Sequence, residues 1–265
     1  MKQDDLISFK QQFSNFCRSF SSENSEDQRN IDLKEDHTRR VCENMVGIGS
    51  GLSLSRNRML LAETIGLFHD IGRFPQYAKY KTFRDSISVN HGLLGAETLI
   101  EKKILQNLSP DEQEIIIQSV KFHNAFAVPK KEKEEIIFFI RLIRDADKLD
   151  IWRVFLEYYE APDEDRATAV GLDLPDVPEY TEAILATLFQ QEIVSLSKIK
   201  TLNDFKLLQL SWVFDLNYKP AFRLLLERDY VNRLIAHLPQ TEGIEKASSL
   251  LKEYVQKRVS DLSLS

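Results

Sequence analysis

The sequence predicts an all-α protein, and three observations support that fold class. Apolar residues recur at intervals of three and four along most of the chain, which is the spacing of one helix face. Glycine and proline are few, nine and eight in 265 residues, and they mostly separate the periodic segments. Hydrophobic residues make up 43% of the chain, which is enough to build a substantial core.

The composition also limits the classes of function. A net charge of -6 argues against a nucleic acid polymer or an anionic membrane as partner. Cys17 and Cys42 have no neighbouring cysteine, so neither a disulfide framework nor a cysteine zinc motif is expected. The first residues lack the pattern of a signal peptide, and no apolar run reaches the roughly 20 residues of a membrane span. We therefore expect a cytoplasmic protein, and the sequence does not indicate its oligomeric state.

Residues 1–30 predict one helix and a polar loop. Leu6, Phe9 and Phe13 begin an apolar stripe that is typical of a core-packing helix, and the polar run from 21 to 30 is typical of a loop. Residues 31–48 predict a second helix with His37 inside its apolar face. A lone histidine at such a place is more often a core side chain than a ligand, so His37 needs partners to be interpreted as one.

A third helix, residues 54–68, ends at His69 and Asp70. An unpartnered aspartate next to a buried helix would be strongly destabilising, so something positive must face Asp70, and a metal ion would satisfy it. The polar and aromatic segment 76–90 is too long for a tight turn. We expect it to form a lid or one wall of a pocket.

Two further helices have clear start signals. Asn90 is placed to cap a helix that opens with His91. Ser109, followed by a proline and then Glu112, is the pattern of a capping box, and the helix that it starts ends at His123. Both histidines therefore lie at helix ends.

The longest periodic segment, residues 136–159, predicts a largely buried helix. It carries Asp145, Asp147 and Asp150, and of these we expect Asp147 to face inward. The acidic, proline-containing stretch 161–178 predicts a break, and the rest of the chain predicts about four more helices.

Six side chains are therefore candidate metal ligands. Apart from one adjacent pair, each comes from a different predicted helix, as in metal sites built inside helical bundles. Their separations along the chain are each about one helix plus a loop. The candidates are His37, His69, Asp70, His91, His123 and Asp147.

This pattern resembles the HD-domain superfamily of metal-dependent phosphohydrolases. The family signature of a histidine, a later His-Asp pair and a distant aspartate matches His37, His69-Asp70 and Asp147. The neighbouring motifs Ile71-Gly72-Arg73-Phe74 and Asn90-His91-Gly92 fit as well. The resemblance implies an HD-domain helical bundle with an additional C-terminal helical extension. Its expected parts are an N-terminal helix and loop at 1–30, the HD domain at 31–160, and the extension at 161–265, packed on that domain.

The resemblance also implies roles for the six ligands. His37, His69, Asp70 and Asp147 hold one metal in minimal family members. His91 and His123 are similar to the pair that holds a second metal in dinuclear members, and Asp70 would bridge the two ions. One or two divalent transition metal ions are expected. Mixed nitrogen and oxygen ligands suit iron, manganese, cobalt, nickel or zinc.

The implied activity is hydrolysis of a small, nucleotide-like phosphomonoester or phosphodiester by a hydroxide bridging the metals. Asp70, Arg73 and Lys148 are the expected catalytic residues, and Arg73, Arg84 and Lys148 the expected phosphate contacts. The alternative for the three cations is an ordinary salt bridge. Some nucleotidase members carry a glutamate where this chain has Arg73, so their mechanism does not carry over.

Two other functions stay open. The same ligand set is similar to that of the mixed-valent di-iron oxygenases of the superfamily, which cleave carbon-carbon or carbon-phosphorus bonds. The domain could also be a ligand sensor without turnover, although nothing would then maintain so polar a core in place of hydrophobic packing.

Overall fold

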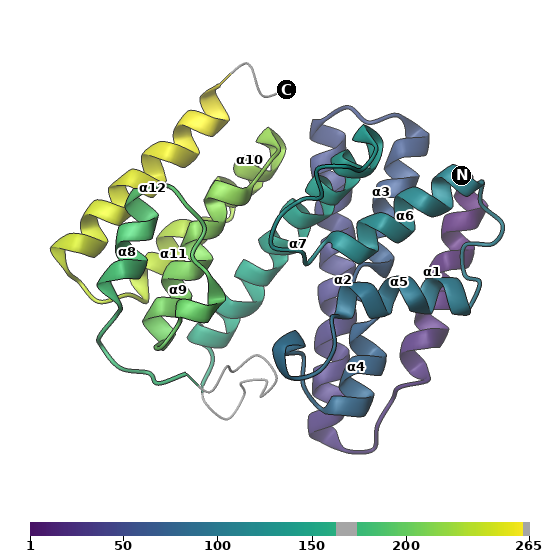
Figure 1. The fold of residues 1–265 in the computed structure, drawn as a ribbon, viewed down its shortest axis with the longest axis horizontal. Coiled ribbons are helices and arrows are strands. Elements are labelled where there is room, and N and C mark those ends of the chain that lie inside the picture. The colour runs from purple at the N-terminus through teal and green to yellow at the C-terminus, as the bar shows by residue number, and fades with distance from the viewer. Residues whose placement is uncertain (163–173, 262–265) are drawn as a thin grey trace. The chain divides into compact units, whose positions relative to one another are not determined.

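The regular structure of the protein is helical. The computed structural model describes residues 1–162 and 174–261, and within these ranges there is no strand (Figure 1). The predicted all-α class is therefore confirmed. Of the predicted break at 161–178, residues 163–173 lie outside the described residues. No helix in the described ranges is long and apolar enough to cross a membrane.

The described residues form two compact units, 1–150 in the first and 151–162 with 174–261 in the second. The boundary between them falls inside one long helix. The division at residue 160, and the packing of the C-terminal part on the rest, stay predictions. The helices that lie wholly in the first unit are α1 (Gln3–Arg18), α2 (Ser25–Gly51), α3 (Arg56–Phe68), α4 (Arg73–Tyr80), the short 3-10 helix η1 (Asp85–Ile87), α5 (His91–Glu101) and α6 (Pro110–Phe122).

Helix α7 (Glu134–Glu160) runs from the first unit into the second. The remaining elements of the second unit are α8 (Glu182–Phe189), η3 (Leu196–Lys198), α9 (Leu202–Ser211), η4 (Trp212–Asp215), α10 (Lys219–Glu227), α11 (Tyr230–Ala236) and α12 (Glu242–Ser260). The described part of the C-terminal region thus has five α-helices after α7, where the sequence predicted about four.

Helix α1 is a core-packing helix, as its apolar stripe predicts. Leu6, Phe9 and Phe13 are buried. The Phe13 ring lies edge-on to two other rings, with centroids 6.3 Å from Phe68 and 5.9 Å from Phe74. These aromatic contacts fix α1 against the end of α3, the helix that leads into the His-Asp pair.

Capping side chains set where the helices begin. The predicted loop at 21–30 is partly wrong, because Asn24 accepts hydrogen bonds from the N–H groups of Glu26 and Asp27 and starts α2 at Ser25. The predictions for the next helices are confirmed. Asn90 caps α5 through the Leu93 N–H, and Ser109 forms the capping box that opens α6.

The segment 76–90, for which a lid or one wall of a pocket stays a prediction, contains helical structure at two places. Helix α4 continues through Tyr80 and ends where Lys81 takes a left-handed conformation, with φ of 52°. The rest of the segment contains the single turn η1 and leads to Asn90, the cap of α5.

Gly72 lets two helices approach closely at the start of α4. A Cβ atom at this position would collide with the carbonyl oxygen of His91 and would lie 2.6 Å from the backbone nitrogen of Gly95. Because both obstacles are backbone atoms of α5, they cannot turn aside. A side chain at residue 72 would therefore separate α4 from α5, and so Asp70 from His91.

Candidate metal centre

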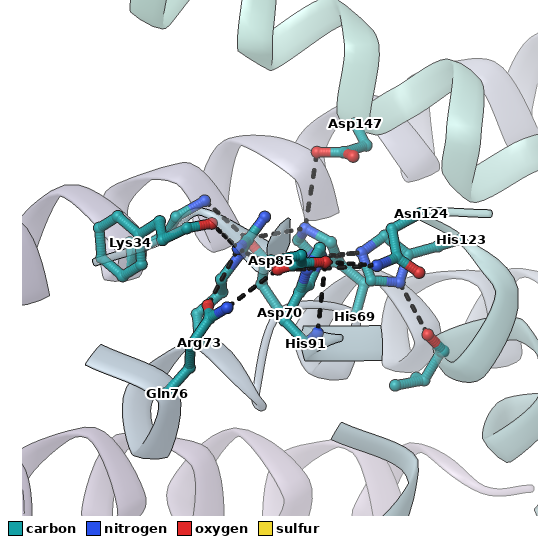
Figure 2. Close-up of polar contacts among 12 residues, drawn as sticks. Lys34, His69, Asp70, Arg73, Gln76, Asp85, His91, His123, Asn124 and Asp147 are labelled. Carbon is teal, nitrogen blue, oxygen red and sulfur yellow. Dashed lines mark hydrogen bonds and ion pairs between the residues drawn. The ribbon is translucent and has the colours of Figure 1, made fainter. Parts of the chain in front are cut away.

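The first unit brings all six predicted ligands to one place. His37 lies in α2, the His69-Asp70 pair directly follows α3, and Asp147 lies in α7. His91 is the first residue of α5, and His123 is the residue after α6. Figure 2 shows His69, Asp70, His91, His123 and Asp147 converging from these different elements.

One part of the cluster, the first subsite, consists of His37, His69, Asp147 and one oxygen of Asp70. The Nε2 atoms of His37 and His69 are 3.2 Å apart. Asp147 Oδ1 lies 3.1 Å from the Nε2 of His37 and 3.7 Å from that of His69. Asp70 Oδ2 lies 3.5 and 3.7 Å from the same two atoms. Each of the two imidazole nitrogens therefore lies within 3.7 Å of an oxygen from both carboxylates.

The other part, the second subsite, consists of His91, His123 and the other oxygen of Asp70. The Nε2 atoms of the two histidines are 3.0 Å apart. Asp70 Oδ1 lies 3.3 Å from His91 and 3.7 Å from His123. The two oxygens of Asp70 thus face different histidine pairs, which is the arrangement that a bridging ligand requires.

Hydrogen bonds at the far side of each ring fix which nitrogen faces the centre. His69 Nδ1 lies 2.8 Å from the carbonyl oxygen of Gly66, and His123 Nδ1 lies 2.7 Å from that of Val120. A carbonyl only accepts, so each Nδ1 carries the proton and donates it. In the neutral rings each Nε2 atom is then unprotonated and directs its lone pair into the cluster.

Carboxylates hold the other two rings in the same way. His37 Nδ1 lies 2.7 Å from Asp150, and His91 Nδ1 lies 2.7 Å from Asp85. Where both rings of a pair are neutral, their Nε2 lone pairs face each other at 3.0 to 3.2 Å and cannot hydrogen-bond to each other, whereas a divalent cation between them satisfies both. The donors present therefore fit a metal ion at each subsite.

The ionisation of the carboxylates suits metal binding too. Burial raises the pKa of Asp70, but the charges of Lys34 and His69 outweigh burial and hold that pKa well below its ordinary value. For Asp147, hydrogen bonds from His37 and His69 overcome burial and lower the pKa likewise. Both carboxylates are therefore anionic at neutral pH, which is the form that binds cations.

His37 and His91, which donate from Nδ1 to carboxylates, differ in their pKa. Burial lowers the pKa of His91 to about 3, so this ring stays neutral. Burial and Lys34 also lower that of His37, but hydrogen bonds to Asp147 and Asp150 prevail and raise its pKa to about 9. Without metal, His37 thus carries a second proton at neutral pH, and that proton competes with a metal ion for the first subsite.

Two cations border Asp70, and the sequence analysis identified only one of them. Lys34 Nζ lies 2.8 Å from Asp70 Oδ2, and Arg73 Nε lies 3.5 Å from Oδ1 (Figure 2). Lys34 precedes His37 by three residues, so the helical spacing that places His37 inward also turns Lys34 toward the cluster. That spacing was the signal from which Lys34 could have been found.

Arg73 is held by other parts of the protein. Its Nη1 donates to Gln76 Oε1 at 2.9 Å, to Asp85 Oδ1 at 3.0 Å and to the carbonyl of Phe83. Arg84 lies next to Asp85, and Lys148 lies next to Asp147 in α7. The phosphate contacts expected of Arg73, Arg84 and Lys148 stay predictions.

Two carboxylates that orient histidines were missed in the sequence. Of the aspartates in this helix only Asp147 was expected to face inward, yet the Asp150 side chain is 2% exposed and contacts His37. The two aspartates are three residues apart and so share a helix face, which the sequence could have indicated. Asp85 lies six residues before His91, in an irregular segment where spacing does not predict a contact.

A helical protein whose buried imidazoles and carboxylates converge in this way is a metal-binding protein by class. Residues 35–152 match the family model described as "HD domain", so the chain carries an HD domain that includes all six candidate ligands. The predicted resemblance is confirmed, and members of this superfamily are generally metal-dependent hydrolases. Comparisons with curated proteins and with solved structures gave no match.

Proposed function

We propose that the protein is a metal-dependent hydrolase of a small phosphate ester, nucleotide-like in chemistry, and that a nucleic acid polymer is not its substrate. The observation that supports this most is the sharing of Asp70 between two facing histidine pairs, with cationic side chains beside it. The HD domain supports the same class of reaction at the level of the superfamily.

The roles of the ligands follow from their positions. His37, His69, Asp70 and Asp147 would hold one ion, and His91, His123 and Asp70 a second. Bound divalent ions of this kind supply an activated water at neutral pH and stabilise charge that develops on a phosphoryl oxygen. Iron, manganese, cobalt, nickel and zinc all suit the donor set.

Lys34 supplies positive charge for an anionic substrate. Its ammonium lies next to Asp70, and it also lies 5.3 Å above the ring of the half-buried Phe83. An ammonium and an aromatic ring beside a metal centre favour a ligand that joins a phosphate to a flat apolar group. This is the basis for proposing a nucleotide-like compound.

Arg73 orients groups of the site. Because Nη1 already donates to three acceptors and Nε faces Asp70, this guanidinium links Asp70 with the segment around Asp85. Its proposed catalytic contribution is to keep Asp70 in place and to add positive charge near the reacting phosphate. Lys148 and Arg84 are proposed as further phosphate contacts.

The test is hydrolysis by protein loaded with one metal at a time. Metal-free protein is supplied with Mn²⁺, Fe²⁺, Co²⁺, Ni²⁺ or Zn²⁺ and incubated with phosphomonoesters and phosphodiesters, nucleotides included, while phosphate or alcohol release is measured. We expect release that depends on metal. Verified metal binding without hydrolysis of any ester would overturn the proposal.

A variant pair tests the contribution of Lys34. Lys34→Gln should raise KM for the best ester by about tenfold, because one charged hydrogen bond to phosphate is lost. Lys79→Gln, which changes an exposed lysine of α4, is the matched control and should leave KM unchanged. Equal KM values for the two variants would exclude Lys34 as a substrate contact.

The oxygenase alternative predicts different behaviour in the same protein. Iron-loaded protein would then consume dioxygen with substrate and show a spin-coupled iron pair by electron paramagnetic resonance. Ester hydrolysis that is equally fast with and without oxygen argues for the hydrolase.

A further inference from the structure

Each subsite contains one histidine that a carboxylate orients from behind. In the first subsite Asp150 accepts from His37 Nδ1, and in the second Asp85 accepts from His91 Nδ1, both at 2.7 Å. The remaining two histidines donate to backbone carbonyls of the turns that carry them. The two carboxylates are therefore the side chains outside the ligand set that orient a histidine ligand.

The two carboxylates lie in very different surroundings. Asp150 is part of the long helix α7, and its side chain is 2% exposed. Asp85 belongs to η1, the single turn between α4 and α5, and its side chain is 30% exposed. The first subsite is thus supported by a buried helix, and the second by a segment at the surface.

Asp85 also gathers several elements around the second subsite. Besides His91, three side chains donate to its carboxylate, from α4 and from the turn after α6 (Figure 2). The donors are Gln76 Nε2 at 2.9 Å, Arg73 Nη1 at 3.0 Å and Asn124 Nδ2 at 3.0 Å. The His91 N–H points to the same carboxylate at 3.4 Å. The segment around Asp85 is therefore fixed by the group that orients His91.

We propose that Asp85 is a positioning residue that sets the metal affinity of the second subsite and leaves that of the first unchanged. An anionic acceptor behind an imidazole fixes the ring and increases the basicity of the facing nitrogen. Asp85 contacts His91 and none of His37, His69 and Asp147, and Arg73, which joins it to Asp70, faces the Oδ1 atom of the second subsite. Its removal should therefore act on one subsite. The inference rests on the metal centre and not on ester hydrolysis, and it can be tested without a substrate.

The experiment is a titration of the metal-free full chain with Mn²⁺, followed by calorimetry and by elemental analysis of the bound metal. We expect two binding events in the unmodified chain. In Asp85→Asn, one event should weaken about 10- to 100-fold and the other should stay within twofold. In Asp150→Asn, the event that Asp85→Asn preserves should be the one that weakens.

Two further variants serve as controls. Asp85→Glu keeps the carboxylate and should recover part of the lost affinity. Asp111→Asn removes an exposed carboxylate from the first turn of α6, 89% exposed, and should change neither event.

If circular dichroism shows that metal-free Asp85→Asn does not fold, a milder variant tests the proposal in its place. Asn124→Ala removes one of the hydrogen-bond donors to Asp85 and should weaken the same single event by about threefold. Three results would overturn the proposal: one event only in the unmodified chain, equal weakening of both events in the Asp85 variants, or no weakening at all.

Discussion

Asp70 in the first unit and Asp204 in the second are both buried aspartates, 2% and 0% exposed, and they differ in what surrounds them. Asp204 accepts from the backbone N–H groups of Thr181, Lys200 and Thr201 at 2.6 to 3.2 Å. It thereby ties the starts of α8 and α9 together. Asp70 meets four imidazoles, Lys34 and Arg73 instead.

The difference teaches how to interpret buried polar groups. In the second unit the buried Lys206 also finds complementary partners nearby, since it donates to Asn203 Oδ1 at 3.1 Å and to the His237 carbonyl at 2.8 Å. In the first unit four imidazoles converge on Asp70 instead, and two neutral rings such as His91 and His123, with Nε2 atoms 3.0 Å apart, cannot satisfy each other. Burial alone therefore indicates stability, whereas the convergence of like groups indicates a ligand.

The largest expected effect is that of Asp70→Ala, which tests the functional half of the comparison. Both subsites lose an oxygen ligand, so bound metal and any hydrolysis should fall to background, as measured by elemental analysis and the ester assay. Asp36→Ala, a half-exposed aspartate of α2, should keep both. A metal content in Asp70→Ala equal to that of the unmodified chain would contradict the site.

Asp204→Ala tests the other half of the comparison, in which a buried aspartate contributes to stability and not to metal binding. It leaves several buried N–H donors without an acceptor and should lower the free energy of unfolding by about 3 kcal/mol. Urea unfolding followed by circular dichroism measures this change. Metal bound per folded chain should be unchanged, and a loss of metal would mean that the contrast between the two aspartates is wrong.

Removal of the metal should have a somewhat smaller effect on stability. An ion present at 100 times its dissociation constant stabilises the folded state by about 2.7 kcal/mol, which corresponds to roughly 5 to 10 °C in Tm for a domain of this size. Thermal scans with Mn²⁺ and after chelation give the shift. It should persist in Asp204→Ala and vanish in Asp70→Ala.

The smallest expected effect is the pH dependence of metal binding, which identifies the binding event that belongs to the first subsite. The raised pKa of His37, about 9, means that the metal-free ring is charged below that pH and must lose a proton when metal binds. Apparent affinity of the first subsite should therefore rise by about tenfold per unit between pH 7 and 9 and then level off. Proton release during Mn²⁺ binding, measured by calorimetry in buffers of different ionisation enthalpy, should come to about one at pH 7.5.

Much of the first unit could be predicted from the sequence because local signals determine it. Caps such as Asn90 and Ser109 fix helix starts, and the apolar stripes fix which face is buried. The six ligands that come together at the centre, from His37 to Asp147, were identified because each lies at a helix end or on a buried face.

The supports of the centre were harder to predict. Lys34 and Asp150 were missed although helical spacing places Lys34 on the face of His37 and Asp150 on the face of Asp147, since charged side chains are by default assigned to the surface. Asp85 carries no periodic signal, because its contact with His91 depends on how η1 folds between two helices. The roles of Arg84 and Lys148 depend on a substrate, which spacing does not describe.

Gly72 has a consequence for comparing sequences. Because any larger residue would separate α4 from α5, the residue at this position indicates whether His91 and His123 can approach Asp70. In an uncharacterised chain with the same His-Asp pair, a bulky residue two places after the aspartate would predict a mononuclear centre even where both later histidines are present. The absence of a side chain can thus be as diagnostic as the presence of a ligand.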